Sequence, residues 1–424
     1  MQADELSPPI DLSLYPDGTS ISAEGALVIG GVPVSELAAS FGTPAYLIDE
    51  GALRARARDY LTAFRSRHAD CEVLFASKSF PAASIVRVLA EEGCGVDVAA
   101  WQELAIAELA GADPRRMVLH GNAKSDADIA AGIASGVGHI VVDNLDDVER
   151  IARLASTPVP VLLRVSPQID AATHETMMTG HDASKFGIPS GQIADVIARI
   201  RREPMLNLRG LHAHIGSGIA DLAQFQAAVA SLAKLERFPV YDFGGGLGER
   251  YVSTDQVPSV DEYAEHLVTA VHRRLGTDVR IMVEPGRSMI ARAGVTVYRV
   301  VTVKRGMRTH VAVDGGMGDN LEVSLYGAAF APSIIDRAAS SEICDVVGRH
   351  CESGDTLVKG IELASPQVGD LITVPVTGAY CYTMANNYNG ALRPPVVLVT
   401  DGIAREVIRR ESLADLVQRD VLAQ

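Results

Sequence analysis

Eight short apolar runs, each followed by a helical stretch, are the feature that most limits how this chain can fold. The runs occupy residues 71–77, 94–98, 116–120, 138–143, 159–165, 208–214, 238–243 and 279–284. Amphipathic, alanine-rich segments such as 126–134, 221–235 and 260–275 separate them. Strands that alternate with helices form parallel β-α-β units, and eight such units favour a closed (β/α)8 barrel of the TIM type within an α/β fold.

The pattern changes beyond residue 290, where strand-like segments follow one another without regular helices between them. These segments are 295–303, 310–314, 356–358, 371–375 and 396–399, and residues 25–48 carry further strand-like pieces. A chain of 424 residues is long enough for about two domains. We therefore expect residues 1–45 to contribute to a β-rich domain, 46–290 to form the barrel, and 291–424 to complete the C-terminal β-rich domain.

The composition argues against several kinds of partner. The net charge is −15 and no long basic stretch occurs, so we expect neither nucleic acid nor an anionic membrane as a partner. No apolar run approaches the ~20 residues of a membrane span, and the acidic start Met1–Glu5 is unlike a signal peptide. The five cysteines include no Cys-x-x-Cys pair, which predicts neither a disulfide framework nor a metal site. We expect a soluble, cytoplasmic protein.

Polar residues or glycines stand at the end of every predicted barrel strand, where barrels of this kind carry their active sites. In chain order these ends hold Lys78, Asp97, His120-Gly121-Asn122, Asp143-Asn144, Arg164, His214, Asp242 and Glu284. Ordinary helix caps would explain Asp143 and Asn144, because Asp and Asn are common in turns. Caps do not explain a lysine, an arginine and two histidines that emerge from apolar strands. The set therefore predicts an active site at this rim.

A glycine-rich loop follows the seventh predicted strand. Gly244, Gly245, Gly246 and Gly248 lack a Cβ, so their backbone N–H groups can approach a phosphate closely. The spacing fits neither the Walker nor the dinucleotide-binding pattern, and a glycine run can also mark a simple turn. A phosphate site at this strand is nevertheless typical of barrels.

Glu284 and Lys78 place a carboxylate and an amine at the predicted rim, and each indicates a specific chemical role. A carboxylate at the eighth strand can keep the ring nitrogen of a bound pyridine protonated, which turns the ring into an electron sink. The alternative is a structural ion pair between Glu284 and Arg287. Lys78 ends a buried run with one amine, a costly placement unless that amine takes part in chemistry.

Several motifs in the same order along the chain resemble a known family. The longer ones are Phe75–Lys78, His214–Ser217, Gly244–Gly246, Glu284–Arg287 and Cys351–Asp355. Shorter ones are Gly42–Pro44, His120–Asn122, Thr179-Gly180 with Ser184–Gly187, Asp314–Met317, Tyr326-Gly327, Gly378–Tyr380 and Tyr388-Asn389. Together they resemble the pyridoxal phosphate (PLP) decarboxylases of the alanine-racemase fold, fold type III, and most of all the diaminopimelate decarboxylase family.

The resemblance implies roles for individual residues. Lys78 resembles the lysine that attaches PLP covalently, and His214 resembles the imidazole that stacks on its ring. The other implied cofactor contacts are Asp97, Arg164, Ser217, Gly244, Gly245, Gly246, Glu284, Gly286, Arg287 and Tyr380. The implied substrate contacts are Arg287, Glu322, Tyr326, Glu352 and Tyr380.

Cys351 resembles the acid that returns a proton to the α-carbon after CO₂ leaves. A thiol suits this role because its unperturbed pKa of ~8.5 keeps it protonated near neutrality. The alternative, a small buried residue, agrees poorly with the polar neighbours Glu352–Asp355. In the family this segment comes from the other subunit, which implies a homodimer with shared active sites.

Three departures from the family bear on the substrate. Where the family has an arginine that contacts the distal carboxylate, this chain has Glu322, which would disfavour a carboxylate and favour an amine or guanidinium unless it points to solvent. Trp101 replaces a glycine of the family and either narrows the pocket or packs in the core. Gly218 replaces a common glutamine, as in ornithine and arginine decarboxylases.

We therefore expect a PLP-dependent amino-acid decarboxylase that converts meso-diaminopimelate to L-lysine and CO₂ in lysine biosynthesis. An alternative is a related enzyme that acts on another amino acid, free or carrier-bound, in specialised metabolism. A racemase of the same fold needs a base on each face of the cofactor, and the Cys351–Asp355 segment favours decarboxylation instead. A non-catalytic PLP-binding homologue would often lose Lys78 or Cys351, and both are present.

Overall fold

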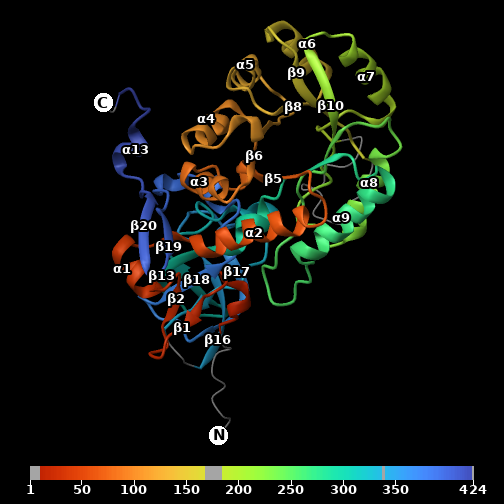
Figure 1. Ribbon diagram of the computed structural model, residues 1–424. Helices are drawn as coiled ribbons and strands as arrows, with labels where there is room; N and C mark the ends of the chain where they lie inside the picture. The colour runs from red at the N-terminus through yellow and green to blue at the C-terminus, as the bar shows by residue number, and fades with distance from the viewer. Residues whose placement is uncertain (1–9, 168–183, 337–339, 423–424) are drawn as a thin grey trace. The chain divides into compact units, whose positions relative to one another are not determined.

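The computed structural model describes residues 10–167, 184–336 and 340–422 of the chain (Figure 1). The Thr179-Gly180 motif lies outside the described residues. The chain divides into two compact units. The barrel unit consists of Arg54–Glu249 and Gln256–Met289, and the β-rich unit consists of Met1–Leu53, Arg250–Asp255 and Ile290–Gln424.

The barrel unit contains the predicted closed barrel of eight parallel strands. The strands are β5 (Cys71–Ala76), β6 (Gly95–Val98), β7 (Met117–Leu119), β8 (His139–Val142), β9 (Val159–Arg164), β10 (Leu206–His212), β11 (Val240–Asp242) and β12 (Arg280–Val283). The barrel closes where β12 pairs with β5, with Val283 opposite Val73. The fold prediction is confirmed. The strand bounds differ from the predicted ones by at most two residues, and β10 in particular ends at His212 and not at His214.

Apolar side chains fill the barrel interior just before the strands end. One buried cluster joins side chains from six strands, and each member is at most 5% exposed. Its members are Leu74, Val118, Val141, Leu162, Val240 and Met282. Because the interior is packed, a ligand of this barrel has room only at its ends, which is the general property of such barrels.

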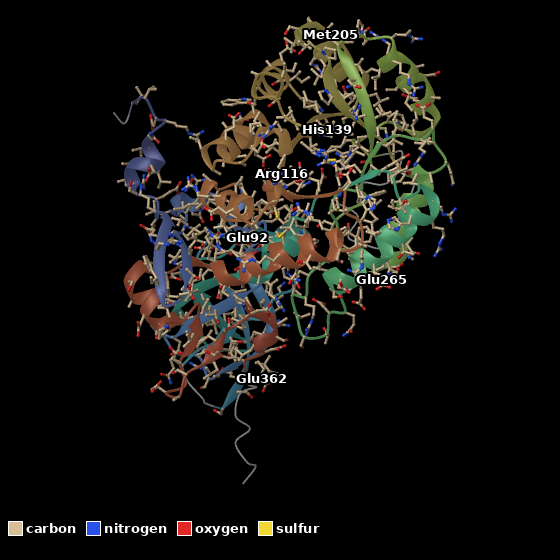
Figure 2. The ribbon with its side chains drawn as sticks, viewed as in Figure 1. Glu92, Arg116, His139, Met205, Glu265 and Glu362 are labelled. Atoms are coloured by element: carbon tan, nitrogen blue, oxygen red, sulfur yellow. The ribbon has the colours of Figure 1, made fainter. Side chains whose placement is uncertain are left out.

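Ion pairs cover the amino-terminal end of the barrel strands. Glu72 of β5, whose side chain is 8% exposed, accepts hydrogen bonds from Arg280 Nη2 at 2.8 Å and from Arg116 Nε at 2.8 Å. Arg116 is labelled in Figure 2. These charged groups satisfy one another at the end of the barrel opposite the predicted active site, where buried carboxylates need such partners.

Helices follow the strands, as Figure 1 shows. They are α2 (Glu50–Arg65), α3 (Ala83–Glu91), α4 (Trp101–Leu109), α5 (Asp126–Ser135), α6 (Leu145–Leu154), α7 (Ile193–Arg201), α8 (Leu222–Leu232) and α9 (Val260–Arg274). N-cap side chains fix the start of three of these helices. Ser125 and Ser259 form capping boxes at the start of α5 and α9, and Asn144 at the start of α6 accepts a hydrogen bond from the backbone N–H of Asp147. Asn144 is thus an N-cap, as the helix-cap alternative predicts. Among the described helices, none is long and apolar enough to cross a membrane.

The β-rich unit is built around one long strand, β13 (Gly294–Lys304). Its sheet has the order β17-β16-β14-β13-β4-β19-β20, and β18 also pairs with β13. These strands are β4 (Ala45–Asp49), β14 (Thr309–Val313), β16 (Ser341–Val347), β17 (Thr356–Ala364), β18 (Leu371–Pro375), β19 (Val396–Thr400) and β20 (Ile403–Ile408). Because β4 lies between β13 and β19, the N-terminal part of the chain supplies an internal strand to a sheet formed mostly by the C-terminal part.

Candidate active site

The barrel strands bring several predicted site residues to one rim. Lys78 lies in the 3-10 turn Ser77–Ser79 directly after β5, and Asp97 lies in β6. Arg164 is the last residue of β9, and Glu284 directly follows β12. Because these strands are parallel, their carboxyl ends meet at the same end of the barrel. Lys78 is exposed, whereas the other three side chains are buried.

Two histidines contact the carboxylate of Glu284, which is 5% exposed. His120 Nε2 lies 2.6 Å from Oε1, and His212 Nε2 lies 3.4 Å from Oε2. Asp242 completes a buried group whose donor atoms all lie within 4.8 Å of one another. A set of two histidines and two carboxylates has the composition of a divalent-metal site. The same arrangement can also hold the Glu284 carboxylate in place against the protonated ring nitrogen of a cofactor.

Our sequence prediction places His120, Asp242 and Glu284 at this rim but gives an individual role only to Glu284, and it misses His212. The omission of His212 follows from the strand boundary, because the predicted strand continues to His214 whereas β10 ends at His212. A signal was present in the sequence: residues two apart in a strand project from the same face, so two histidines in this spacing mark a polar position at a strand end.

The protonation states in this group follow from burial and mutual contact. Burial raises the pKa of Asp97 to about 6 and that of Asp242 well above its usual value. Burial lowers the pKa of His212 to about 3. Burial alone would raise the pKa of Glu284, but His120 and His212 outweigh it and lower this pKa well below the usual value. Near neutral pH Glu284 is therefore ionised beside a neutral His212.

His214 lies in the loop after β10 as a neutral imidazole. Burial lowers its pKa well below the usual value, and the nearby charges of Lys78 and Arg164 lower it further. Its ring packs against the glycine loop, since a Cβ on Gly244 would lie 2.7 Å from His214 Nδ1. A flat, uncharged ring close to Lys78 is suited to stacking on an aromatic cofactor.

The glycine loop after β11 leaves no space for side chains. A Cβ on Gly245 would lie 2.2 Å from the carbonyl oxygen of Glu284, and one on Gly246 would lie 2.7 Å from that of Gly216. Gly246 also has a φ of +128°, which side chains rarely allow. Nearby, Arg287 Nε donates to Ser217 Oγ at 3.2 Å. The loop is a compact cradle with a hydroxyl and a guanidinium beside it, which is a suitable donor set for a phosphate.

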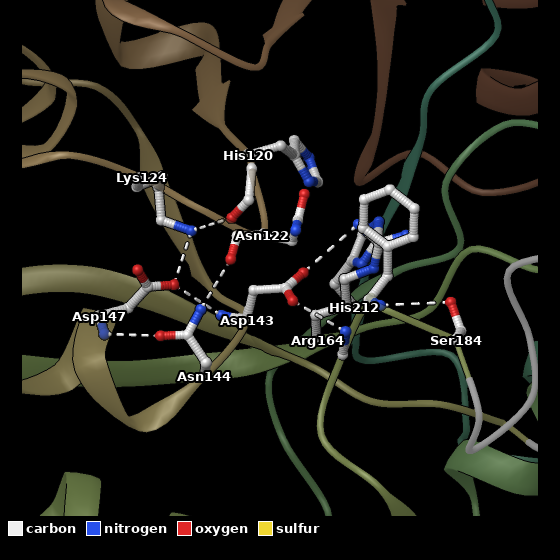
Figure 3. A network of polar contacts seen from close by, with 12 residues as sticks. His120, Asn122, Lys124, Asp143, Asn144, Asp147, Arg164, Ser184 and His212 are labelled. Carbon is white, nitrogen blue, oxygen red and sulfur yellow. Dashed lines mark hydrogen bonds and ion pairs between the residues drawn. The ribbon is translucent and has the colours of Figure 1, made fainter.

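A buried polar network joins the ends of β7, β8 and β9 (Figure 3). Lys124 Nζ lies 2.7 Å from Asp147 Oδ2, and their side chains are 1% and 0% exposed. Asp147 accepts from the backbone N–H of Asp143, whose own Oδ2 lies 3.5 Å from Arg164 Nη1. The Arg164 guanidinium also lies 4.5 Å from the centre of the Phe186 ring. The network therefore supports Arg164 at the rim.

The other predicted site residues lie in the β-rich unit. Glu322 is 1% exposed in the first turn of α11 (Leu321–Tyr326), so the alternative that it points to solvent is wrong. Cys351 is exposed, so the alternative of a small buried residue is wrong; its backbone N–H donates to Asn389 Oδ1 at 2.8 Å. Glu352 is exposed as well, and Tyr326 and Tyr380 are partly buried. Their role in one site with Lys78 stays a prediction.

Two further positions concern the departures from the family pattern. Trp101 is the first residue of α4, after the two residues that follow β6, and is 44% exposed, so packing in the core is excluded for it. Gly218 has a φ of +77° with open space around its Cα. A glutamine there would face backbone strain in this loop conformation, which gives a physical reason for glycine.

Comparison with known proteins agrees with this geometry. Residues 50–291 match the family model described as pyridoxal-dependent decarboxylase, pyridoxal binding domain. The chain belongs to this family. It is 42% identical to a diaminopimelate decarboxylase from Actinosynnema pretiosum subsp. auranticum, over 98% of this chain and 97% of that protein. It is 38% identical to the diaminopimelate decarboxylase of Bacillus subtilis (strain 168), over 96% and 98%.

Solved structures give the same result. The diaminopimelate decarboxylase of M. jannaschii, in co-complex with L-lysine, superposes with a TM-score of 0.90 at 28% identity and covers 96% of this chain and 98% of that one. A lysine/ornithine decarboxylase from Vibrio vulnificus, with a TM-score of 0.75 and 23% identity over 87% of this chain and 97% of that one, shares the fold. The protein is a PLP-dependent carboxy-lyase, and its barrel rim, with Lys78, Glu284 and the glycine cradle, fits that cofactor.

The Lys124–Asp147 pair makes a direct prediction about stability. Lys124→Met should lower the free energy of unfolding by about 3 kcal/mol, because Asp147 stays buried with Arg150, at 3.9 Å, as its nearest remaining cation. Urea unfolding followed by circular dichroism measures the change. As a control, Arg153→Met removes an exposed pair with Asp126, whose side chains are 57% and 56% exposed, and should cost less than about 1 kcal/mol. Equal losses in both variants would contradict the prediction.

Proposed function

We propose that this protein decarboxylates meso-diaminopimelate to L-lysine and CO₂, as a step of lysine biosynthesis. The observation that carries the proposal is the similarity to diaminopimelate decarboxylases along nearly the whole chain. The structural neighbour with bound L-lysine supports the same reaction product. Similarity over both units matters because the predicted substrate contacts lie mainly in the β-rich unit and the cofactor contacts in the barrel.

Bound PLP supplies an electron sink for the charge that remains at the α-carbon when CO₂ leaves. In this proposal Lys78 attaches the cofactor, and Glu284 holds a proton at its ring nitrogen. His214 stacks on the ring, while Ser217 and the glycine loop bind the phosphate. Asp97 and Arg164 are further cofactor contacts at the rim, and burial of both keeps water away from these charges.

The substrate contacts complete the proposed site. Arg287, Tyr326, Glu352 and Tyr380 orient the amino acid so that the bond to the scissile carboxylate can break. Cys351 then returns a proton to the α-carbon, a role for which its exposed thiol is accessible. We further propose a homodimer in which Cys351 reaches the site of the other copy. The five cysteines, all free among the described residues, and the acidic composition support a cytoplasmic location.

Glu322 favours a second candidate function. Its carboxylate is 1% exposed and stands where the family has an arginine for the distal carboxylate of the substrate. If Glu322 faces that end of the pocket, it disfavours diaminopimelate by roughly a few kcal/mol and favours a substrate whose distal end is cationic or neutral. The protein would then decarboxylate another amino acid, free or attached to a carrier.

The covalent role of Lys78 gives the first test of the proposed function. Borohydride reduction of the PLP-loaded protein should fix the cofactor to the peptide that contains Lys78, as peptide mass spectrometry can show. Lys78→Ala should lose both this label and CO₂ release from meso-diaminopimelate, because no other amine takes its place. Lys359→Ala, which changes an exposed lysine of β17, should keep both. Full turnover by Lys78→Ala would refute the assignment.

Shared sites in a homodimer predict complementation between two inactive variants. Lys78→Ala and Cys351→Ala proteins should each be slow alone, and mixing them should restore part of the activity. Subunit exchange creates one site that carries both native residues, so at most about half of the sites can recover. The measurement is CO₂ release after mixing, with exchange verified by tagged subunits. Verified exchange without recovery would count against shared sites.

A charge reversal at Glu322 separates the two candidate substrates. If Glu322 faces the distal end of the substrate, Glu322→Arg should raise kcat/KM for meso-diaminopimelate by about 10-fold or more, equivalent to about 1.4 kcal/mol. Glu322→Gln, which only removes the charge, should give a smaller rise in kcat/KM for meso-diaminopimelate. This variant keeps the test possible if the arginine variant does not fold. Glu406→Arg makes the same charge change at an exposed position of β20 and should have no effect.

Efficient turnover of diaminopimelate by the wild type, with no change in either Glu322 variant, would remove the second candidate. Preference of the wild type for lysine, ornithine or arginine over diaminopimelate would instead reject the first.

A further inference from the structure

The group around Glu284 contains more titratable side chains than a single ring nitrogen needs. Asp97, His120, His212 and Asp242 are all buried near Glu284, at 3%, 7%, 1% and 0% exposure. The rings of His120 and His212 meet edge to face with their centres 4.7 Å apart. Buried polar groups of this density are costly unless each is satisfied or used, so their arrangement calls for a function.

His120 occupies the central position in this group. Its Nε2 lies 2.6 Å from Glu284 Oε1 and 3.7 Å from Asp97 Oδ1, between two carboxylates. An ionised carboxylate only accepts hydrogen bonds, so Nε2 must carry the proton and donate it toward Glu284. The contact of His212 to the other oxygen of Glu284 is longer, at 3.4 Å. His120 therefore makes the stronger of the two contacts that orient the Glu284 carboxylate.

We propose that His120 is a positioning residue that keeps Glu284 ionised and oriented, and so determines whether the ring nitrogen of the bound cofactor carries a proton. The proposal rests on the proposed function in one respect, the placement of Glu284 against the ring nitrogen. His120 acts through Glu284 and touches neither the substrate nor the reacting atoms.

The charges around Glu284 explain why this role is needed. Asp97 and Asp242 both interact with Glu284, and neighbouring carboxyl groups disfavour one another's ionisation, so the three groups compete for the negative charge. Burial acts in the same direction. Without the hydrogen bond from His120, Glu284 would take up a proton and become a neutral carboxylic acid. A neutral acid cannot stabilise the protonated, positively charged form of the ring nitrogen. Asp242 also accepts from the backbone N–H of Gly244 at 2.9 Å, which ties the group to the glycine loop.

Two substitutions that differ by one methylene test the proposal. The amide nitrogen of His120→Gln reaches the place of Nε2 and keeps a donor to Glu284, whereas that of His120→Asn is too short. The probe is PLP labelled with ¹⁵N at its ring nitrogen, and the chemical shift of the bound cofactor reports the proton. We expect His120→Asn to shift this signal toward that of an unprotonated pyridine and to lower kcat by about 10–100-fold with little change in KM. His120→Gln should keep most of the wild-type signal.

His139 supplies the matched control. It is a mostly buried histidine at the start of β8, the opposite end of a barrel strand, and is labelled in Figure 2. His139→Asn should leave the ¹⁵N signal unchanged even if it lowers the melting temperature of the apoprotein. An unchanged ¹⁵N signal and an unchanged kcat in a folded, PLP-loaded His120→Asn protein would overturn the proposal. One equivalent of tightly bound metal in the wild type would also overturn it, because His120 and Glu284 would then be metal ligands. Failure of the wild type to bind PLP would refute the proposed function itself.

Discussion

Closure of the barrel by pairing of β12 with β5 is the constraint on which the catalytic rim depends. Ile281 lies opposite Cys71 and Val283 opposite Val73, so the last barrel strand lies beside the first. The residues that follow these strands, Glu284 and Lys78, therefore reach the same rim although they are far apart in the sequence. An open sheet of the same strands would place them at opposite edges, and no single cofactor could contact both.

Burial of Asp97, Asp242 and Glu284 at this rim determines which of these carboxyl groups are ionised. Three carboxylates cannot all be ionised in a space of low dielectric constant. Burial raises the pKa of Asp97 to about 6 and that of Asp242 well above its usual value. Glu284 is the exception, because the charge interactions with His120 and His212, together with their hydrogen bonds, outweigh its burial and lower its pKa. An anion held at a defined position is what a protonated ring nitrogen requires.

The rim also depends on a support that makes no contact with the proposed substrate. The Lys124–Asp147 pair is buried, so its two charges interact more strongly than an exposed pair such as Arg153–Asp126, whose side chains are 57% and 56% exposed. Through the backbone of Asp143 this pair holds the end of β8 beside Arg164. Stability and site geometry are therefore linked in this part of the barrel.

The sequence by itself determined the barrel strands, because each is a short apolar run bounded by polar caps, and it placed Lys78 and Glu284 at their ends. It did not reveal β16 and β20, whose charged residues give no apolar pattern and which are strands only because they pair with neighbours. Nor did it distinguish Lys124 or Glu322 from surface charges. Burial of a charged side chain depends on which distant residues pack around it, and only the tertiary structure decides that.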